Sequence, residues 1–302
     1  MIEFKPITLE EKDLILHYTL PFAPYDCDFS FGNLVAWSFL SQSSFALIGD
    51  SLVIRCTLPD GSHFYHLPIG VEDKVGVIKQ LDDYAGQKKE VLKLRGHQAE
   101  LQDIMEKCLL GKFEYKSDRN YFDYIYLRQD LVDLSGKDYQ AKRNHVNKFS
   151  KLNSYTYTPI TPDILPYCME LETEWCKKRH CFEIDGLRYE YRAFCNAVEH
   201  FEALGMVGGA IWVNKEIVSF TMGTPVNHEC FDIEFEKANT DIDGAYAIIN
   251  REFAARLPQQ YVYLNREEDM GLEGLRKAKL SYHPTFMVEK CLAVKTNPLE
   301  YV

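Results

Sequence analysis

The pattern of apolar and polar residues along the chain predicts alternating strands and helices. Short runs rich in β-branched and aromatic residues predict strands, and apolar residues recurring every three or four positions predict helices. After Pro162 and Asp163, for example, an apolar stripe at helical spacing follows, made up of Ile164, Cys168, Leu171 and Trp175. The strand at residues 230–236 alternates strictly instead. Together these patterns predict an α/β protein with mixed sheets.

The first half of the chain is predicted to hold a strand, two helices and an antiparallel hairpin, then further helices and strands. Turn signals at Gly49-Asp50 and Asp60-Gly61 separate the hairpin strands. The predicted segments are, in order, 2–8, 11–20, 32–40, 45–57, 63–69, 71–88, 89–96, 98–109 and 113–134, the last of them as strand material.

The second half is predicted to be joined to the first by a helix at residues 136–151. A strand, two helices, a hairpin turning at residues 214–216, a central strand, a helix that ends before Pro258, a strand, a short helix and a last strand follow. This order is that of a domain of the acetyltransferase (GNAT) superfamily, and the first half can be read the same way. By this analogy we expect two tandem GNAT-like domains, at residues 1–135 and 136–302.

Composition is that of a soluble globular protein, with 302 residues, 46% hydrophobic residues and 26% charged residues. The amino terminus lacks a basic segment followed by an apolar one, so no signal peptide is expected. The longest uncharged run, at residues 29–49, is interrupted by polar residues and makes a poor membrane span. A cytoplasmic protein without an integral membrane segment is therefore expected.

Nine cysteines without a regular spacing favour a reducing compartment, in which most of them are buried thiols. Cys176, His180 and Cys181 suggest zinc, but no second pair of ligands follows at a suitable distance. We therefore expect no metal, and a helix end with incidental thiols.

The formal net charge of −11 argues against a general nucleic-acid-binding protein. Residues 136–151 are an exception, because five basic residues there accompany a single acid. Lys142 and Arg143 on this predicted helix are candidate contacts for a phosphate or carboxylate, including the end of a tRNA. The alternative is a solvated helix between the domains, with His145 as an ordinary surface histidine.

Three carboxylates share one face of the strand at residues 230–236, namely those of Asp232, Glu234 and Glu236. Alternate residues on a strand lie about 7 Å apart, and the repulsion between their charges raises at least one pKa. Asp232 and Glu234 are therefore candidate general bases toward an amine or hydroxyl. The alternative is a solvated or ion-paired sheet face.

A loop and helix start follow this strand, where acyl-CoA acetyltransferases bind pyrophosphate through backbone amides. The candidate CoA loop comprises Thr240, Asp243, Gly244, Ala245 and Tyr246. It has a single glycine, and its flanking acids oppose an anion and are simple helix caps. CoA or acyl-CoA is thus a candidate cofactor with weak local support.

The segment 263–282 places Asn265 and Arg266 where a predicted strand leaves the sheet, the edge at which ligands bind in open α/β sheets. A short helix with acids before it and bases in its last turn follows, an order that the helix dipole alone explains. Arg276, Lys277 and Lys279 are weaker candidates than Asn265 and Arg266. Tyr282 and His283 after the helix could donate or accept a proton.

Residues 136–149, 235–254 and 263–284 resemble the soluble carboxyl-terminal domain of bacterial phosphatidylglycerol lysyltransferases, and more closely a family of stand-alone bacterial proteins grouped with it. Residues 26–37 are similar to the opening pattern of that family. The likeness spans nearly the whole chain and implies tandem acetyltransferase-like folds, related to the aminoacyl-tRNA-dependent enzymes that build peptidoglycan bridges.

The resemblance implies transfer of an aminoacyl group from a charged tRNA to a lipid hydroxyl or to another amine or hydroxyl. It implies Asp232 or Glu234 near the acceptor, Arg266 with Lys277 or Lys279 on a phosphate, and Asn265 and Tyr282 as donors to the oxyanion. The chain lacks the multi-span membrane part of the lipid enzymes, which weakens the case for a lipid acceptor. The alternatives are an acyl-CoA-dependent N-acyltransferase and a non-catalytic binding protein on a transferase fold.

Overall fold

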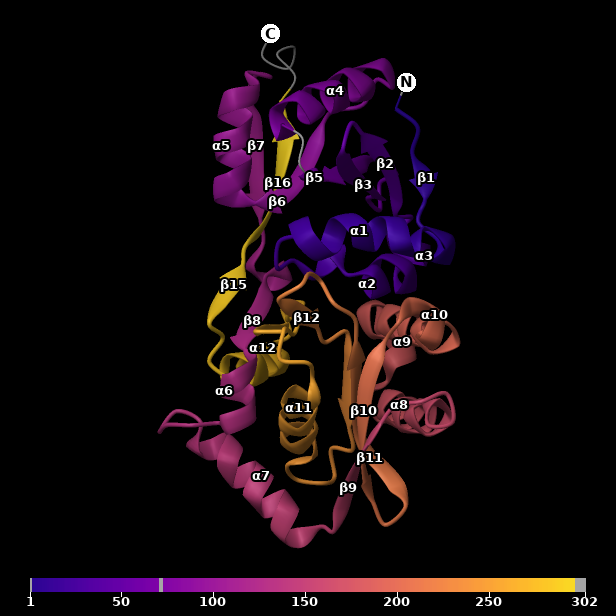
Figure 1. Cartoon of the computed structure of the whole chain (residues 1–302), viewed down its shortest axis with the longest axis vertical. Coiled ribbons are helices and arrows are strands. Elements are labelled where there is room, and N and C mark those ends of the chain that lie inside the picture. Colours follow the sequence, from indigo (N-terminus) through magenta and orange to yellow (C-terminus); the bar gives the residue numbers. More distant parts are fainter. Residues whose placement is uncertain (1, 71–72, 297–302) are drawn as a thin grey trace.

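The computed structural model describes residues 2–70 and 73–296 and shows two halves stacked along the long axis (Figure 1). Residues 297–302, the end of the predicted second domain, lie outside the described residues, as do residues 71–72 of one predicted helix. Helices α1 (Lys12–Phe22) and α2 (Phe31–Ala36) lie between the sheet of the first half and the second half.

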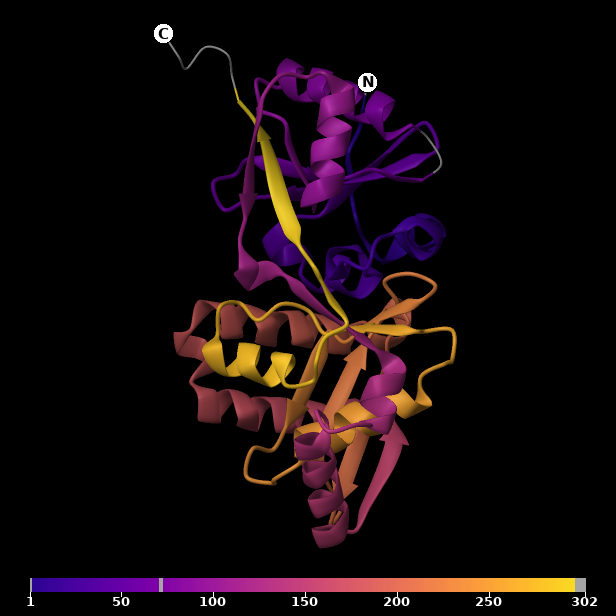
Figure 2. The same ribbon diagram turned by 90° about the vertical axis from the view of Figure 1, so that its left-hand side faces the viewer.

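The first half contains a sheet of eight strands in the order β1-β2-β3-β4-β6-β16-β7, with β5 paired to β3. The strands are β1 (Lys5–Pro6), β2 (Ser44–Ile48), β3 (Ser51–Thr57), β4 (His63–His66), β5 (Ile69–Gly70), β6 (Lys93–His97), β7 (Phe113–Ser117) and β16 (Lys290–Lys295). The last strand of the chain, β16, lies antiparallel between β6 and β7, and Figure 2 shows it passing up from the second half.

The second half contains two sheets of four strands, in the orders β13-β11-β10-β9 and β12-β14-β8-β15. The strands are β8 (Asp123–Leu127), β9 (Tyr155–Pro159), β10 (Val207–Val213), β11 (Glu216–Gly223), β12 (Cys230–Asp232), β13 (Phe235–Ala238), β14 (Tyr263–Asn265) and β15 (Phe286–Val288). Strand β8 precedes residue 135 yet pairs with β14 and β15. The domain boundary near residue 135 stays a prediction, and strand pairings cross it in both directions.

Two helices, α2 and α4, start at side-chain caps that the sequence encodes. The Ser30 hydroxyl accepts a hydrogen bond from the backbone amide of Asn33 at the start of α2. The Asp73 carboxylate accepts one from the backbone amide of Val75 at the start of α4. The other helices are α3 (Ser38–Ser41), α4 (Lys74–Gln87), α5 (Gln98–Cys108), α6 (Arg128–Asp133), α7 (Gln140–Leu152), α8 (Leu165–Arg179), α9 (Asp185–Glu199), α10 (Phe201–Leu204), α11 (Ala245–Arg256) and α12 (Glu273–Leu280).

The end of the predicted strand segment 113–134 is the helix α6, so this part of the prediction was wrong. Leu127, Leu131 and Leu134 recur at helical spacing, and the last two are buried in the core. Contact of α6 with α11 supplies the apolar surface that makes the helical arrangement favourable.

The predicted strand 230–236 is also interrupted. Strand β12 pairs in parallel with β14, whereas β13 pairs antiparallel with β11, so the two pieces join different sheets. At Gly223, the last residue of β11, the backbone oxygen of Asp232 lies so close that no side chain fits. Asp232 therefore ends a strand and Glu234 lies in the gap between two sheets, and neither lies in the middle of a strand as expected.

The two halves share a hydrophobic core. One cluster of buried residues joins Ile15 and Phe31 from the first half with Phe194, Phe220 and Phe235 from the second. Full burial of each such side chain contributes about 1.5–3 kcal/mol. The junction between the halves is thus held by apolar packing, and polar groups buried beside it are kept from bulk water.

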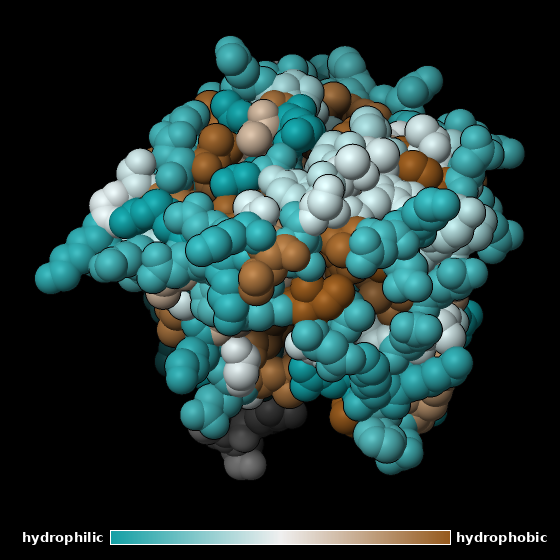
Figure 3. All heavy atoms as spheres, turned by 90° about the horizontal axis from the view of Figure 1, so that it is seen from below, coloured by the Kyte–Doolittle hydropathy of each residue, from teal (hydrophilic) through white to brown (hydrophobic). Residues whose placement is uncertain are grey.

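The end of the molecule farthest from the first half is mostly hydrophilic, with a small group of apolar side chains near its middle (Figure 3). Within residues 2–70 and 73–296, no helix combines the length and the apolar character needed to cross a lipid bilayer.

A buried lysine ties the last strand to both halves. The Lys290 ammonium, at the start of β16, lies 2.8 Å from Asp123 of β8, 3.1 Å from Asp26 and 3.4 Å from Asp28. Burial opposes its charge, but the three carboxylates raise the pKa of Lys290 well above its ordinary value. Arg95 of β6 adds a second cation 3.0 Å from Asp28.

We expect Lys290→Met to lower the free energy of unfolding by about 3–5 kcal/mol, because it leaves buried carboxylates without their cation. Burial raises the pKa of Asp26 and Asp123, so these groups take up protons readily as the pH falls. The loss should therefore be larger at about pH 8 than at about pH 5. Urea unfolding at both pH values measures it.

Lys295→Met is the matched control, since Lys295 lies on the same strand and pairs with the partly exposed Asp82 at 2.6 Å. We expect it to cost about 1 kcal/mol or less. Equal losses for the two variants would contradict the role assigned to Lys290.

Candidate active site

Two carboxyl groups from separate segments meet at the side chain of Asn33 on α2, and a third, that of Glu234, lies close enough to influence them. The Asn33 amide donates to Oδ2 of Asp232 at 2.9 Å and to Oε1 of Glu267 at 2.8 Å. Asp232 ends β12, and Glu267 follows the parallel strand β14. The carboxyl ends of two parallel strands therefore bring these groups together at the junction between the halves. We call Asp232, Glu234 and Glu267 the carboxylate cluster.

Glu234, the third member, has one oxygen anchored by the first half and by β11. Its Oε1 accepts hydrogen bonds from the hydroxyls of Thr224 and Ser30. At Gly32 a side chain would occupy the place of this carboxyl group, so glycine lets Glu234 lie against α2. The other oxygen, Oε2, is buried and has no hydrogen-bond partner. Asp232 has the same arrangement, with Oδ2 held by Asn33 and Oδ1 free.

No cation of the described residues lies beside the carboxyl groups of the cluster, so their charges are not neutralised when they are ionised. Within the described part of the chain, no lysine, arginine or histidine nitrogen lies within 4.0 Å of its carboxyl oxygens. Burial first, and then the neighbouring carboxylates of Glu267 and Glu234, raise the pKa of Asp232 well above its usual range. Burial raises the pKa of Glu234 to about 7. Glu234 therefore exchanges protons near neutral pH, as a general acid or base must.

Asn265 positions the cluster. Its amide nitrogen donates to Tyr25 at 2.8 Å and to Asp123 at 2.9 Å, so both hydrogens are used. Its oxygen accepts from the Glu267 backbone amide, which holds Glu267 in the left-handed region at a φ of 54°. The expectation that Asn265 donates to an oxyanion does not fit this geometry, because no amide hydrogen is left for one.

Arg266, the next residue, belongs to a different group. Its guanidinium lies 2.7 Å from Glu236 and 4.9 Å from the centre of the Tyr282 ring. The Lys142 ammonium of α7 lies 3.9 Å from the same ring centre. Burial raises the pKa of Tyr282 to about 12, so its phenol stays protonated at neutral pH. Tyr282, Lys142 and Arg266 are thus gathered together, while no contact joins Tyr282 to the carboxylate cluster among the hydrogen bonds of the described residues.

The other predicted cations serve the backbone or face solvent. Arg143 donates to the carbonyl oxygens of Leu134 and Gly136. Lys279 is buried and donates to those of Arg266 and Glu268, whereas Lys277 is exposed.

Arg276 of α12 forms an ion pair with the buried Asp269 at 2.7 Å, and Tyr124 donates to the same carboxylate. These contacts fix the turn before α12. Arg276 therefore has a structural partner of its own.

The candidate CoA loop is covered by α7. A side chain at Gly244 would lie 2.6 Å from the backbone oxygen of His145. Asp243 accepts from His145 at 2.9 Å and pairs with Lys148 at 2.7 Å, both on α7. Thr240 is exposed, Ala245 is buried, and the partly buried Tyr246 has its pKa raised by burial. The start of α11 is thus packed against a helix, which leaves little room for a pyrophosphate there.

The cysteines considered as zinc ligands are bonded to each other. Cys176 and Cys181 form a disulfide with a Cα–Cα distance of 5.0 Å, whereas the other seven cysteines are free. Three sets of ligand atoms within 4.8 Å of one another occur in the described residues, at Asp26, Cys27 and Asp123, at Asp26, Asp28 and His66, and at Cys27, Asp232 and Glu267. The Lys290 ammonium, 3.2 Å from the Cys27 sulfur, already supplies a cation at the first of these sets.

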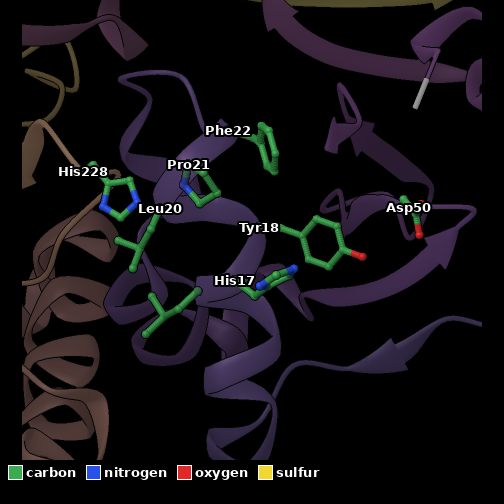
Figure 4. A pocket seen from close by; sticks show the side chains of 8 residues that line it. His17, Tyr18, Leu20, Pro21, Phe22, Asp50 and His228 are labelled. Atoms are coloured by element: carbon green, nitrogen blue, oxygen red, sulfur yellow. The ribbon is translucent and has the colours of Figure 1, made fainter. Parts of the chain in front are cut away.

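A surface pocket of about 510 Å³ lies beside α1 and contains none of these groups (Figure 4). It is lined mainly by side chains of α1, including His17, and Asp50 and His228 come from other segments. The carboxylate cluster is therefore a separate feature of the junction.

The sequence predicts Asp232 and Glu234 as candidate site residues, but not Asn33, Asp123 or Lys290. Glu267 is expected from the sequence at the mouth of the sheet with Asn265 and Arg266, without a role of its own. The signal for Asn33 was present in residues 26–37, where polar residues interrupt an apolar run and the family likeness was noted. Only the fold brings that segment against residues more than 190 positions later.

Comparisons with known proteins agree with this architecture. A crystal structure of a conserved protein of unknown function from Bacteroides thetaiotaomicron is 47% identical, covers 98% of this chain and 100% of its own, and has a TM-score of 0.94. L-PGS from Bacillus licheniformis is 16% identical, with a TM-score of 0.65 over 97% of this chain and 93% of its own. FemX is 11% identical, with a TM-score of 0.61 over 96% of each chain. The last two share the fold alone.

A curated relative, an uncharacterised protein of Mycoplasmoides gallisepticum, is 23% identical over 172 residues. The match covers 56% of this chain and 55% of that protein, so it spans about half the length of the relative.

The mixed α/β architecture, and the fold shared with L-PGS and FemX, confirm the predicted fold class. Family and fold together support a transferase of this type. The family described as phosphatidylglycerol lysyltransferase, C-terminal, matches residues 21–294. The chain therefore belongs to that family.

Proposed function

We propose that the chain is an aminoacyltransferase that moves an aminoacyl group from a charged tRNA to an amine or hydroxyl, with Glu234 and Asp232 as proton acceptors. One observation carries this proposal. Each of these carboxyl groups has one oxygen held by hydrogen bonds and one that is buried and unpaired. A fixed carboxyl group with a free oxygen and a raised pKa is what a general base requires.

In the proposed reaction the nitrogen or oxygen of the acceptor attacks the ester carbonyl carbon of the donor. Glu234 or Asp232 takes the proton that the acceptor loses. The bond from the carbonyl carbon to the tRNA ribose oxygen then breaks, and that oxygen receives the proton. Asn33 and Thr224 hold the two carboxyl groups in place throughout.

The charge of the site favours an aminoacyl donor over acyl-CoA. An aminoacyl ester carries an ammonium group, which the cluster attracts at close range when its carboxyl groups are ionised. CoA carries several negative charges, and its usual place at the start of α11 lies beneath His145 of α7. The partly exposed Asn33 and Glu267 mark the side of the cluster open to solvent.

We expect Glu234→Gln to reduce kcat by about 10²–10⁴-fold, because the amide cannot accept the proton. In the unchanged protein, burial raises the pKa of Glu234 to about 7, so activity should rise with pH through this value and fall below it. The variant should lose this inflection. Initial rates across a pH series measure both effects.

The same variant should fold normally. Because the folded-state pKa of Glu234 lies above its unfolded value, ionisation of this group destabilises the folded protein as the pH rises toward about 7. Above that pH the variant should resist urea at least as well as the unchanged protein. Glu229→Gln, an exposed carboxylate in the preceding loop, is the control and should leave rate and pH profile unchanged.

The donor is tested with tRNA charged with a radiolabelled amino acid, presented with amine acceptors and, separately, with phosphatidylglycerol vesicles. We expect label to reach one acceptor class, and the transfer to be lost in Glu234→Gln.

Failure to bind charged tRNA at low salt, where phosphate contacts are strongest, would contradict the tRNA donor. A thermal shift with acyl-CoA would then favour the CoA-dependent alternative. Binding of charged tRNA without transfer to either acceptor class would favour the non-catalytic one.

A further inference from the structure

Two cations lie over the ring of one tyrosine, Tyr282. Lys142 of α7 and Arg266 after β14 both lie over the Tyr282 ring, with their charged groups 3.9 Å and 4.9 Å from its centre. Glu236 of β13 is the one acid that pairs with either cation in the described part of the chain, at 2.7 Å from Arg266. We call Lys142 and Arg266 the cation pair.

The ion pair leaves polar atoms unused on both partners. Nη2 of Arg266 donates to Oε1 of Glu236, but Nη1 of Arg266 is buried without a hydrogen-bond partner, as is Oε2 of Glu236. Burial, and then the charge of Arg266, lower the pKa of Lys142 to about 8. Two cations near one anion, with an orphaned guanidinium N–H, form a place that a further anion would stabilise.

We propose that the cation pair binds a phosphate group of the acyl donor, which replaces Glu236 as the partner of Arg266. A phosphate oxygen would satisfy Nη1 and a second would take the place of the carboxylate at Nη2, since guanidinium groups bind phosphate through two parallel hydrogen bonds. Lys142 would supply a point charge on the side of α7. This inference rests on the proposed transferase function and adds the place where its donor is held.

The place of Arg266 in the chain suits this role. Glu236 follows Glu234 by two residues and lies on β13, which begins after the gap. Arg266 directly follows Asn265, which positions Glu267 of the carboxylate cluster. A phosphate held by Arg266 would thus lie on the same segment as Glu267 of the carboxylate cluster.

Helix α7 explains why the phosphate is held here and not at a helix start. The same helix covers Gly244 at the beginning of α11 with His145, and presents Lys142, one turn earlier, to Tyr282. It closes the anion site usual for CoA in this fold and contributes a cation to another. Of the residues predicted to contact a phosphate, Lys142 and Arg266 remain candidates. Arg143 and Lys279 donate to backbone carbonyl oxygens instead.

Calorimetric titration of the full chain tests the site directly, without any need for activity. The probes are inorganic pyrophosphate, adenosine 5′-monophosphate as the smallest mimic of a tRNA 3′ end, and CoA. Relative to the unchanged protein, we expect Lys142→Gln and Arg266→Gln to bind pyrophosphate about 10- to 100-fold more weakly. Glu236→Gln should bind it about tenfold more tightly, because the competing carboxylate is gone.

Lys151→Gln is the matched control, since it removes an exposed cation from the far end of the same helix and should leave affinity unchanged. Lys142→Gln keeps the test valid if the Arg266 variant misfolds. Lys142 has no ion-pair partner in the described chain, so its replacement should leave the fold intact. If adenosine 5′-monophosphate binds and both cation variants weaken its binding, the site is supported and the phosphate belongs to a tRNA donor. If CoA shows this behaviour instead, the site is supported and the phosphate belongs to CoA.

Absence of pyrophosphate binding would overturn the proposal. So would equal affinity in the unchanged protein and both cation variants, or weaker binding by Glu236→Gln. These results would leave the proposed transfer chemistry standing, since it depends on Glu234 and Asp232. Conversely, a loss of transfer activity with intact pyrophosphate binding would count only against the proposed function.

Discussion

The charge balance at Lys290 is the constraint on which the junction between the halves depends. A buried ammonium cannot be left unpaired, and here its partners come from the loop before α2 and from β8. Because Lys290 begins β16, the last strand must run between β6 and β7 of the first half in the register that delivers this charge. Asp123 in turn accepts from Asn265. One buried ion network thus links β16, the loop before α2, β8 and the support of the carboxylate cluster.

Beside this neutralised network lies a group of acids that is not neutralised. Asp232, Glu234 and Glu267 are held by amide and hydroxyl donors, which orient their oxygens without cancelling their charge. Burial of such groups is unfavourable unless they take up protons, and their raised pKa values express that cost. Natural proteins keep unfavourable arrangements of this kind mainly where chemistry needs them.

The gap between β12 and β13 is the geometric counterpart of this arrangement. A continuous strand would present its carboxylates to one sheet face, as ladder pairing demands. Because of the break, Asp232 and Glu234 lie at the junction with α2, whereas Glu236 pairs with Arg266. One short stretch of sequence therefore supplies the carboxylate cluster and the counter-ion of the cation pair, on either side of a change of sheet.

The sequence by itself determined the elements, the fold class and part of the site. Periodicity and caps locate most helices and strands because these are local properties, and Asp232, Glu234 and Arg266 stand out because charges in apolar strands are costly. Tertiary structure alone decided which charges meet. That Asn33 bonds Asp232, that Lys290 neutralises Asp123, and that α7 covers Gly244 are contacts between segments far apart in the chain. No local pattern encodes them, because their free energy arises only when the two halves bury them together.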